Sequence, residues 1–384
     1  MEELLNTMNN TCSAYCIHLI RAVMQETDVP EKPVNLSLEE LFAFAKLHNV
    51  EALIYHGLCQ TEVDVSDPVW RKWENRAAML LAQGVVQLAE RDAVFSALTS
   101  AGIPLLPFKG CWLKELYPNM EYRQMADLDM LIPAEKAAEA KRIMLSLGYS
   151  TEEFENMPNH AGYLKPPYTE VELHTALLVE DRGYYDRVWE QVHPVENCPG
   201  LYRFCPEDEY IYYLLHLNKH LEDAGTGIRS VLDSLVYRQA YPNMDCAYLR
   251  QELEKWGLWE RIQEIEGLSD CWFVTGKEVP EELEGLAQHI LTAGAFGTVE
   301  IRSERRLEKL REKYKNPVIR GIVYWIIRTC RPMEEMAQCY PVLKKLPVLL
   351  PFFWFHRAVM KFAKSPKAVW HHIKLAFGKG ENHG

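Results

Sequence analysis

The feature that most constrains the fold is a change of hydrophobic pattern near residue 103 of the 384-residue chain. On both sides of the segment 103–178 apolar residues recur at helical spacing, but within it short apolar runs alternate with one helix-like stretch. The parts are two strand-length runs, a helix ending at a glycine, and a hairpin with two prolines at its turn: Ile103–Phe108, Leu128–Ile132, Ala134–Leu147 before Gly148, and Tyr163–Leu178 around Pro166 and Pro167. This alternation predicts a short sheet with helices, a small mixed α/β core.

The regions that flank this core are predicted to be helical. Leu36–Leu58 and Trp70–Gly102 carry apolar residues at helical spacing, and Ser37 with Glu40 has the pattern of a capping box. A chain of this length exceeds what one hydrophobic core usually supports. We therefore expect an α+β fold in three parts: an N-terminal helical region (1–95), the α/β core (96–204), and a C-terminal helical region with a basic tail (205–384).

Composition excludes several classes of protein. The ten cysteines are scattered and form no Cys-x-x-Cys pair, which argues against a zinc ribbon, a redox motif or a disulfide framework. The N-terminus starts with acidic residues and lacks the basic start of a signal peptide. The longest apolar run, Leu346–Phe355, contains two prolines and is too short for a transmembrane helix. We expect a soluble, cytoplasmic protein with reduced thiols.

Charge is distributed unevenly along the chain. The net charge is −12, but residues 303–384 contain 17 Lys and Arg against 6 Asp and Glu, a charge of +11, which leaves −23 for the first 302 residues. An acidic body repels the nucleic-acid backbone, so bulk nucleic-acid binding is not expected outside the basic tail. We expect this tail to dock on the acidic body. The alternative is that its aromatic, basic stretch Tyr340–Phe362 lies on an anionic membrane surface.

Asp127-Leu128-Asp129 is the most chemically suggestive motif in the core. Residues i and i+2 of a strand point to the same face, so the two carboxylates project together while Leu128 points the other way. Two carboxylates so close repel each other, and a divalent cation removes that penalty. Oxygen ligands favour Mg²⁺ or Mn²⁺ over zinc.

A second strand, Tyr168–His174, places Glu170, Glu172 and His174 on one face by the same period of two. A further carboxylate from a neighbouring strand is what a one- or two-metal phosphoryl-transfer site requires, because metals polarise the phosphate and activate the attacking hydroxyl. The additional acid can bind that metal or accept the proton. Each motif alone is unspecific, and the prediction depends on their combination with the strand that ends at Lys109-Gly110.

Three segments of this core resemble a known family. They are Ile103–Gly110 (IPLLPFKG), Tyr122–Ile132 (YRQMADLDMLI) and Val171–Leu177 (VELHTAL). They resemble the uncharacterised nucleotidyltransferase family within the DNA polymerase beta-like superfamily. That superfamily carries a Gly-Ser or Gly-Gly turn, then Asp-x-Asp or Asp-x-Glu, then a third acid on a later strand. The resemblance covers roughly residues 80–240.

The resemblance implies a metal-dependent enzyme that moves a nucleoside monophosphate from an NTP to a hydroxyl or amine and releases pyrophosphate. It implies that Asp127 and Asp129 bind Mg²⁺ or Mn²⁺, that Glu172 is the third metal-binding and catalytic acid, and that Lys109 and Gly110 contact the triphosphate. Here the sequence departs from the superfamily, because Lys-Gly stands where Gly-Ser is usual. A lysine would supply a point charge in place of the serine hydroxyl. The acceptor, whether protein, tRNA or small molecule, is not specified by the sequence.

Other residues are candidates for nucleotide binding. Arg123 lies four residues before Asp127, where a guanidinium can contact phosphate, or it is an ordinary surface arginine. His174 either orients Glu172 or contacts nucleotide, unless it is a core histidine with its hydrogen bonds satisfied.

The helical region after residue 205 holds the remaining candidates. In the family this region lies near the nucleotide, which adds Lys219, Arg229 and Asp233, although Arg229 and Asp233 also have the spacing of a helical ion pair. His216 and His220 have the spacing of zinc ligands, but the Glu of a zinc-protease motif and a third ligand are missing. A zinc site is not expected.

Two other functions stay open at this point. The Asp-x-Asp motif also occurs in nucleotide-sugar glycosyltransferases, but these usually place about a hundred residues of α/β structure before it, and here that stretch looks helical. The missing Gly-Ser also fits a binding protein on a catalytically decayed nucleotidyltransferase fold.

Overall fold

The computed structural model describes residues 2–151, 160–167, 169–177 and 188–295, and beyond these residues 307, 310–311, 313–330, 333, 336 and 340–364. The chain divides into two compact units. The first comprises Met1–Leu221 and Thr226–Phe296, and the second comprises Glu222–Gly225 and Gly297–Gly384. Tyr168 and Leu178 of the predicted hairpin lie outside the described residues, as does the end of the basic tail.

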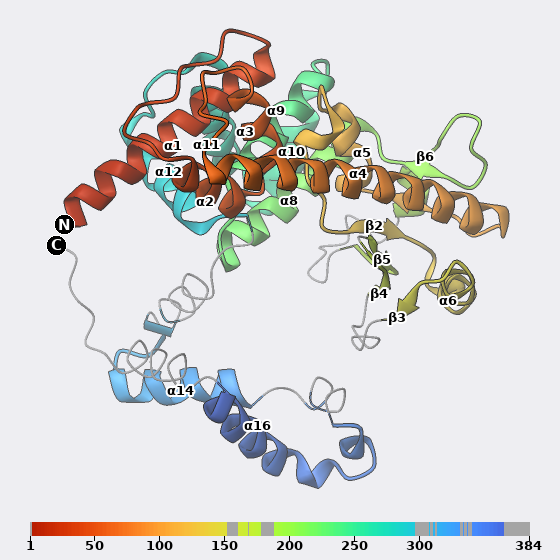
Figure 1. Ribbon diagram of the computed structural model, residues 1–384. Helices are drawn as coiled ribbons and strands as arrows, with labels where there is room; N and C mark the ends of the chain where they lie inside the picture. Colours follow the sequence, from red (N-terminus) through yellow and green to blue (C-terminus); the bar gives the residue numbers. More distant parts are fainter. Residues whose placement is uncertain are drawn as a thin grey trace. The chain divides into compact units, whose positions relative to one another are not determined.

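Helices make up most of the first unit (Figure 1). Those before the sheet are α1 (Glu2–Gln25), α2 (Leu38–His48), α3 (Glu51–Leu58) and α4 (Pro68–Ser100). Those between and just after the strands are α5 (Gly110–Leu113), η1 (Lys114–Leu116), η2 (Met120–Tyr122), η3 (Ala134–Lys136), α6 (Ala137–Ser146) and α7 (Val188–Gln191). The last group is α8 (Pro206–Asp223), α9 (Ile228–Ala240), α10 (Cys246–Trp256), α11 (Trp259–Asp270), the π-helical turn η4 (Cys271–Thr275) and α12 (Glu281–Ala293).

The predicted helical stretch Leu36–Leu58 is two helices rather than one. The capping box is present as expected, because the Ser37 hydroxyl accepts the Glu40 amide and the Glu40 carboxylate accepts the Ser37 amide. Asn49 then ends α2 in the left-handed conformation, with φ 55°, before α3 begins. Asparagine adopts this conformation more readily than most residues, so it ends a helix without interrupting the apolar spacing.

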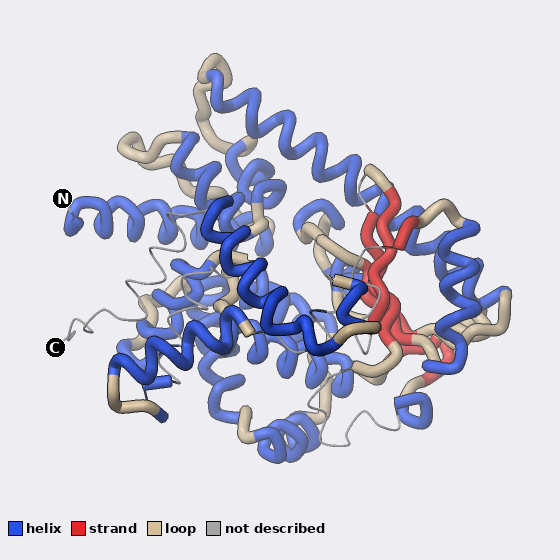
Figure 2. Tube along the Cα trace, turned by 90° about the horizontal axis from the view of Figure 1, so that it is seen from below, coloured by secondary structure: helices blue, strands red, loops and turns tan. Residues whose placement is uncertain are grey.

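Within the described residues, five strands form one mixed sheet (Figure 2), with the order β1-β2-β5-β4-β3. They are β1 (Leu106–Pro107), β2 (Leu128–Leu131), β3 (Ser150–Thr151), β4 (His160–Lys165) and β5 (Thr169–His174). Only β2 and β5 run parallel, and β4 and β5 form the antiparallel hairpin expected from the sequence. A separate pair of short strands is β6 (His193–Pro194) with β7 (Tyr202–Arg203). The predicted α+β fold with a small mixed sheet is confirmed.

The two faces of the sheet have different environments. Leu128, Met130, Val171 and Leu173 are buried in one hydrophobic cluster with residues of α4 and α6. By the strand period of two, the alternate residues of β2 and β5 point to the opposite face. On that face Leu131 belongs to the large helical core that includes α8. The polar residues Asp129, Glu172 and His174 of these strands therefore lie between the sheet and the helices.

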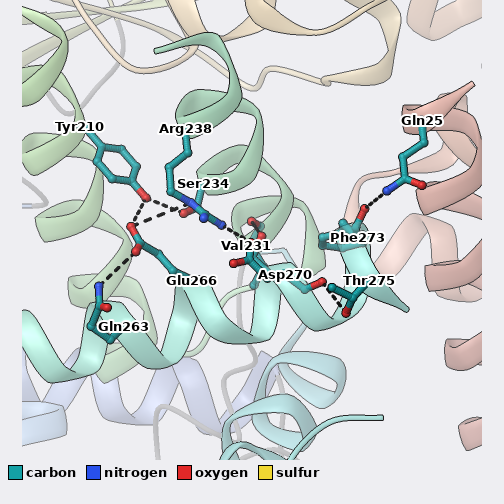
Figure 3. Close-up of polar contacts among 11 residues, drawn as sticks. Gln25, Tyr210, Val231, Ser234, Arg238, Gln263, Glu266, Asp270, Phe273 and Thr275 are labelled. Atoms are coloured by element: carbon teal, nitrogen blue, oxygen red, sulfur yellow. Dashed lines mark hydrogen bonds and ion pairs between the residues drawn. The ribbon is translucent and has the colours of Figure 1, made fainter. Parts of the chain in front are cut away.

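Helices that precede and follow the sheet in sequence share this large core, which draws on α1 to α4 and on α8 to α12. Figure 3 shows part of its polar framework. The Tyr210 hydroxyl of α8 lies 2.7 Å from Ser234 Oγ of α9 and donates to Glu266 of α11 at 2.7 Å. Gln25 of α1 donates to the Phe273 carbonyl at 3.0 Å. The N-terminal and later helices are thus one packing unit.

The long helix α4 runs past the sheet (Figure 1) and holds the connection between β1 and β2. Gln87 donates to the Met125 carbonyl at 3.2 Å, and Arg91 donates to the Cys111 carbonyl at 2.8 Å. Both α4 side chains are buried. Backbone carbonyls of an irregular segment need such partners when they are buried. Helix α4 therefore fixes the segment that leads from β1 into β2, where several candidate site residues lie.

The second unit contains α14 (Pro317–Thr329), η5 (Pro341–Lys344), η6 (Pro347–Leu349) and α16 (Leu350–Lys364). Its described buried side chains form two small clusters: Leu307, Leu310 and Tyr324, and Met336 with Leu343. None of the described helices combines the length and apolar character that crossing a bilayer requires.

The capping box of α2 gives a first prediction. Ser37→Ala removes the acceptor for one orphan amide, so we expect the free energy of unfolding to fall by about 1 kcal/mol. Urea denaturation followed by circular dichroism measures this change. Ser146→Ala is the matched control, because Ser146 is an exposed helical serine that only donates back to the Ile143 carbonyl. An equal loss in both variants contradicts the capping role.

Candidate active site

Three polar side chains converge where β2 and β5 run parallel. The strands are in register with Asp129 opposite Glu172, so both project from the same face of the sheet. His174 Nε2 lies 3.0 Å from Asp129 Oδ1 and 3.2 Å from Glu172 Oε2. One ligand atom from each of the three lies within 4.8 Å of the others. The structure thus brings together two of the three predicted acids with a histidine between them.

Burial and the neighbouring residues shift the pKa of Asp129 in opposite directions, and the neighbours have the larger effect. Burial alone would raise the pKa of Asp129, but the Lys109 ammonium at 2.9 Å and the His174 hydrogen bond hold this pKa well below its usual range. The Asp129–Lys109 pair likewise keeps the pKa of Lys109 above its usual value although burial lowers it. Hydrogen bonds to Asp129 and Glu172 similarly raise the pKa of His174 against the effect of burial. Asp129 is therefore ionised and compensated.

The pKa of Asp127 shifts in the opposite direction. Burial, reinforced by repulsion from Asp129, raises the pKa of Asp127 to about 6, and Lys109 only partly offsets this. No ion pair of Asp127 is found in the part of the chain that the structure describes. Of the two acids in the Asp-x-Asp motif, only Asp127 has a raised pKa. A cation bound beside Asp127 would relieve the repulsion that raises it.

Lys109 reaches Asp129 from a strained backbone. Its φ of 52° and ψ of −122° lie in a region that favours glycine, yet a lysine occupies the turn between β1 and α5. Gly110 follows at a crowded position, because a Cβ there would lie 3.0 Å from Met125 Sδ and 3.1 Å from Arg123 Nη1, so these side chains would have to shift. The turn therefore holds the lysine ammonium against the acidic cluster.

These residues line one cleft of about 330 Å³. Its lining combines the acids Asp127, Asp129 and Glu172 with cationic groups and one face of α8. The full set is Lys109, Gly110, Arg123, Gln124, Met125, Ala126, Asp127, Asp129, Glu172, Tyr213, His216, Leu217, His220, Thr226, Arg229, Ser230, Asp233 and Ala295. Of the predicted site residues, Lys219 is exposed and does not line the cleft. His174 does not line it either, but it contacts two residues that do, Asp129 and Glu172.

A cationic cluster forms another part of the cleft. Arg123 is buried and makes two hydrogen bonds to Asp233, at 2.8 and 3.0 Å, so Asp233 pairs with Arg123 rather than with Arg229. Arg229 donates to the Gln124 carbonyl at 2.9 Å, and its buried Nε finds no partner among the described residues. Burial and the neighbouring Arg123 lower the pKa of Arg229.

Lys114 adds to this positive charge. Its ammonium donates to the Arg123 carbonyl at 2.9 Å, and burial together with repulsion from Arg123 lowers its pKa to about 8. Lys114, Arg123 and Arg229 thus lie close enough to repel one another, and Asp233 forms its ion pair with Arg123. An anion in the cleft would relieve this imbalance.

The face of α8 that lines the cleft was not assigned a role from the sequence. Tyr213, His216, Leu217 and His220 follow the spacing i, i+3, i+4 and i+7, which marks one face of a helix. His216 Nε2 and His220 Nε2 lie 3.2 Å apart. Burial, with repulsion from Lys109, lowers the pKa of His216 well below its usual value, so this imidazole is neutral. The signal that could have found this face is the helical spacing of Tyr213, His216 and His220.

The donor set fits a hard divalent cation better than zinc. Ligand atoms of Asp129, Glu172 and His174 lie close together, and Asp127 adds a further carboxylate to the lining of the same cleft. The zinc-type pair His216–His220 gains no third ligand among the described residues. A cation bound between Asp129 and Glu172 would take over the compensation that Lys109 and His174 provide in this structure.

The raised pKa of Asp127 gives a prediction about stability and pH. The folded protein binds this proton more tightly than the unfolded chain, so stability falls as pH rises from about 4 to about 6. Asp127→Asn lacks this penalty and should be more stable than the parent by about 2–3 kcal/mol at pH 7.5 without metal, with little difference at pH 4. Urea denaturation at the two pH values tests this.

The exposed residue Asp28 supplies the matched control. Asp28→Asn should leave the stability unchanged at both pH values. A gain from Asp127→Asn that is the same at pH 4 and pH 7.5 would show that the carboxylate is not held in a charge-opposing site.

The solved structures that resemble this chain include two remote matches. One is to a solution structure titled for the antibiotic-resistance factor ANT(2'')-Ia and its substrate-regulated conformation dynamics, with 13% identity over 47% of this chain and 97% of that chain and a TM-score of 0.34. The other is to a crystal structure of ANT(2'')-Ia in complex with adenylyl-2''-tobramycin, with 12% identity, 46% and 99% coverage and a TM-score of 0.33. Both TM-scores are low, and neither similarity supports an inference about this chain.

Comparison with curated proteins gives no match. A protein-family model described as uncharacterised nucleotidyltransferase matches residues 35–273, which is more than half of the chain. That range contains the strand that ends at Lys109, the Asp-x-Asp segment and the strand of Glu172, the parts whose resemblance to this family the sequence showed. The chain belongs to this family of uncharacterised nucleotidyltransferases.

Proposed function

We propose that the protein is an active, metal-dependent nucleotidyltransferase that moves a nucleoside monophosphate from an NTP to a hydroxyl or amine. The observation that carries this proposal is the pairing of opposite charges in one cleft. Asp127, Asp129 and Glu172 line it together with Arg229, whose Nε has no partner among the described residues. A metal–triphosphate complex presents the complementary cation and anion to these two groups.

The acids would hold the metal. Asp129 and Glu172 face each other on parallel strands, and Asp127 lies one residue before β2 and lines the same cleft. A bound Mg²⁺ or Mn²⁺ would polarise the phosphate and lower the pKa of an attacking hydroxyl. His174 fixes the orientation of the two carboxylates that it contacts, Asp129 and Glu172.

The cationic residues would hold the phosphates. The guanidinium of Arg229 lines the cleft and can donate hydrogen bonds to phosphate. The guanidinium of Arg123 also lines the cleft and is held in place by its hydrogen bonds to Asp233. Charge-assisted hydrogen bonds of this kind are stronger than neutral ones. Lys109 is paired with Asp129 here, so a role on the triphosphate requires that a bound metal release it. Gly110 has no side chain, so a phosphate could approach the backbone closely at the same turn.

Label transfer tests the activity. The protein is incubated with each α-labelled NTP, Mg²⁺ and cell lysate, and the label is followed into macromolecules and small metabolites. We expect one NTP to label an acceptor class, with the signal lost on chelation of the metal and in Asp129→Asn and Glu172→Gln, because each removes a metal-binding charge. Asp92→Asn, an exposed acid on α4, is the control that retains activity.

The outcomes separate the proposal from its alternatives. Full activity in Asp129→Asn rules out metal catalysis at this site. Label transferred from a nucleotide sugar, and from no NTP, identifies a glycosyltransferase. Absence of both transfer and nucleotide binding at millimolar NTP and Mg²⁺ identifies a binding protein on a decayed fold, in which Lys109 permanently occupies the position of the metal charge.

Arg229 gives a prediction with two readouts. Arg229→Gln removes one charge-assisted contact, so NTP affinity measured by calorimetry should fall about ten- to a hundredfold. Without nucleotide the same variant should be more stable than the parent, because the substitution removes a positive charge that is repelled by Arg123 and disfavoured by burial. The matched control is Arg238→Gln, since Arg238 is also half-buried but pairs with Asp270 away from the cleft. It should lose stability and keep its NTP affinity.

If Arg229→Gln binds NTP as tightly as the parent, Arg229 is not a phosphate ligand. A variant that loses both stability and affinity would show instead that Arg229 supports the fold through its bond to the Gln124 carbonyl.

A further inference from the structure

The second compact unit exposes an unusual amount of apolar surface. Helix α14 presents Val318, Ile319, Ile322 and Ile326 to solvent, and the spacing i, i+1, i+4 and i+8 places all four on one face. The opposite face of this helix holds Tyr324, which is buried against the unit's own small core. The exposed stripe is therefore a second apolar face.

Helix α16 and the turn before it repeat this arrangement. Phe352, Phe355 and Val359 are exposed at the spacing i, i+3 and i+7, again one helix face. Val348 and Leu349 of η6 are exposed just before it. On the opposite side Phe353 and Trp354 pack against this unit's small core cluster of Met336 and Leu343. The core of the unit is formed without the exposed side chains.

The charge of this region has one sign. Residues 336–380 contain eight Lys and Arg and no Asp or Glu. Exposed Lys345 lies in the turn between η5 and η6, beside the apolar residues Val342 and Leu346. An amphipathic segment with exposed aromatic residues and only basic charges has the composition of a helix that lies in a membrane interface. The attraction of Lys and Arg to anionic lipids adds to the burial of the apolar face.

We infer that the second unit docks on an anionic lipid surface, with the exposed stripes of α14 and α16 entering the interface and the basic residues contacting lipid phosphates. The occupant is lipid rather than nucleic acid, because the stripes are built largely of Val, Ile and Leu, which offer nothing to stack on a base. The acidic first 302 residues complement the charge of the unit, whereas an anionic lipid interface complements both its charge and its apolar surface.

Vesicle sedimentation with the full chain tests this inference. The probes are phosphatidylcholine vesicles with and without one quarter phosphatidylserine, at 0.1 M and 0.5 M salt. We expect at least tenfold tighter association with the acidic vesicles, weakened at the higher salt. The double variant Phe352→Glu with Phe355→Glu should weaken it at least tenfold, and Ile322→Glu with Ile326→Glu should act in the same direction.

The matched control is Val65→Glu with Val85→Glu in the first unit. Val65 and Val85 are 69% and 61% exposed, close to the 69% and 60% of Phe355 and Phe352, so the control adds the same charge at equally exposed apolar sites. It should bind vesicles like the parent, and thermal unfolding should confirm that all variants are folded.

Three results overturn the inference. Failure of the parent chain to sediment with acidic vesicles shows that the stripes are covered, as they would be by docking on the acidic body. Equal losses in the control and in the Phe352→Glu, Phe355→Glu variant show a charge effect without a docking face. Unchanged vesicle binding in the phenylalanine variant, with displacement by RNA, assigns the basic residues to nucleic acid. Because the assay uses neither NTP nor metal, its outcome is independent of the proposed transferase activity.

Discussion

The parallel pairing of β2 and β5 is the constraint on which the candidate site depends. It places Asp129 directly opposite Glu172, and the strand period sends both to the face away from α4 and α6. Asp129 is buried and Glu172 is half-buried, and two carboxylates so close together are costly unless cations accompany them. Lys109 and His174 supply that compensation in the structure, and they do so on Asp129. Asp127 is left with a raised pKa, and a cation bound in the cleft would lower it.

The rest of the first unit serves to hold this pair of strands and its surroundings. Helix α4 binds the carbonyls of the segment that joins β1 to β2, and α9 contributes Asp233, which fixes Arg123. Helices from both ends of the sequence share one core, so the wall formed by α8 and α9 is set by packing over long sequence distances. The cleft therefore combines a wall of acids on the sheet with a cluster of cations on loops and helices.

Sequence reasoning could predict what depends on local pattern. The mixed core, the hairpin, the capping box of α2 and the common face of the acids all follow from periodicity and turn chemistry. Which residue pairs with Asp233 could not be predicted, because i, i+4 spacing favours Arg229 while the folded chain brings Arg123 from 110 residues away. The opposite pKa shifts of Asp127 and Asp129 also depend on tertiary neighbours, since the motif alone treats the two acids as equivalent.

The central claim is that the acidic cluster is built for a metal bound with a triphosphate. Its most direct test is a crystal structure with Mn²⁺ and a non-hydrolysable NTP analogue, in which anomalous scattering locates the metal. The account predicts a metal peak coordinated by Asp129 and Glu172, with Lys109 released from Asp129 and phosphate oxygens at Arg229. A peak elsewhere, or an acidic cluster that keeps the Lys109–Asp129 pair and holds no metal, would contradict it.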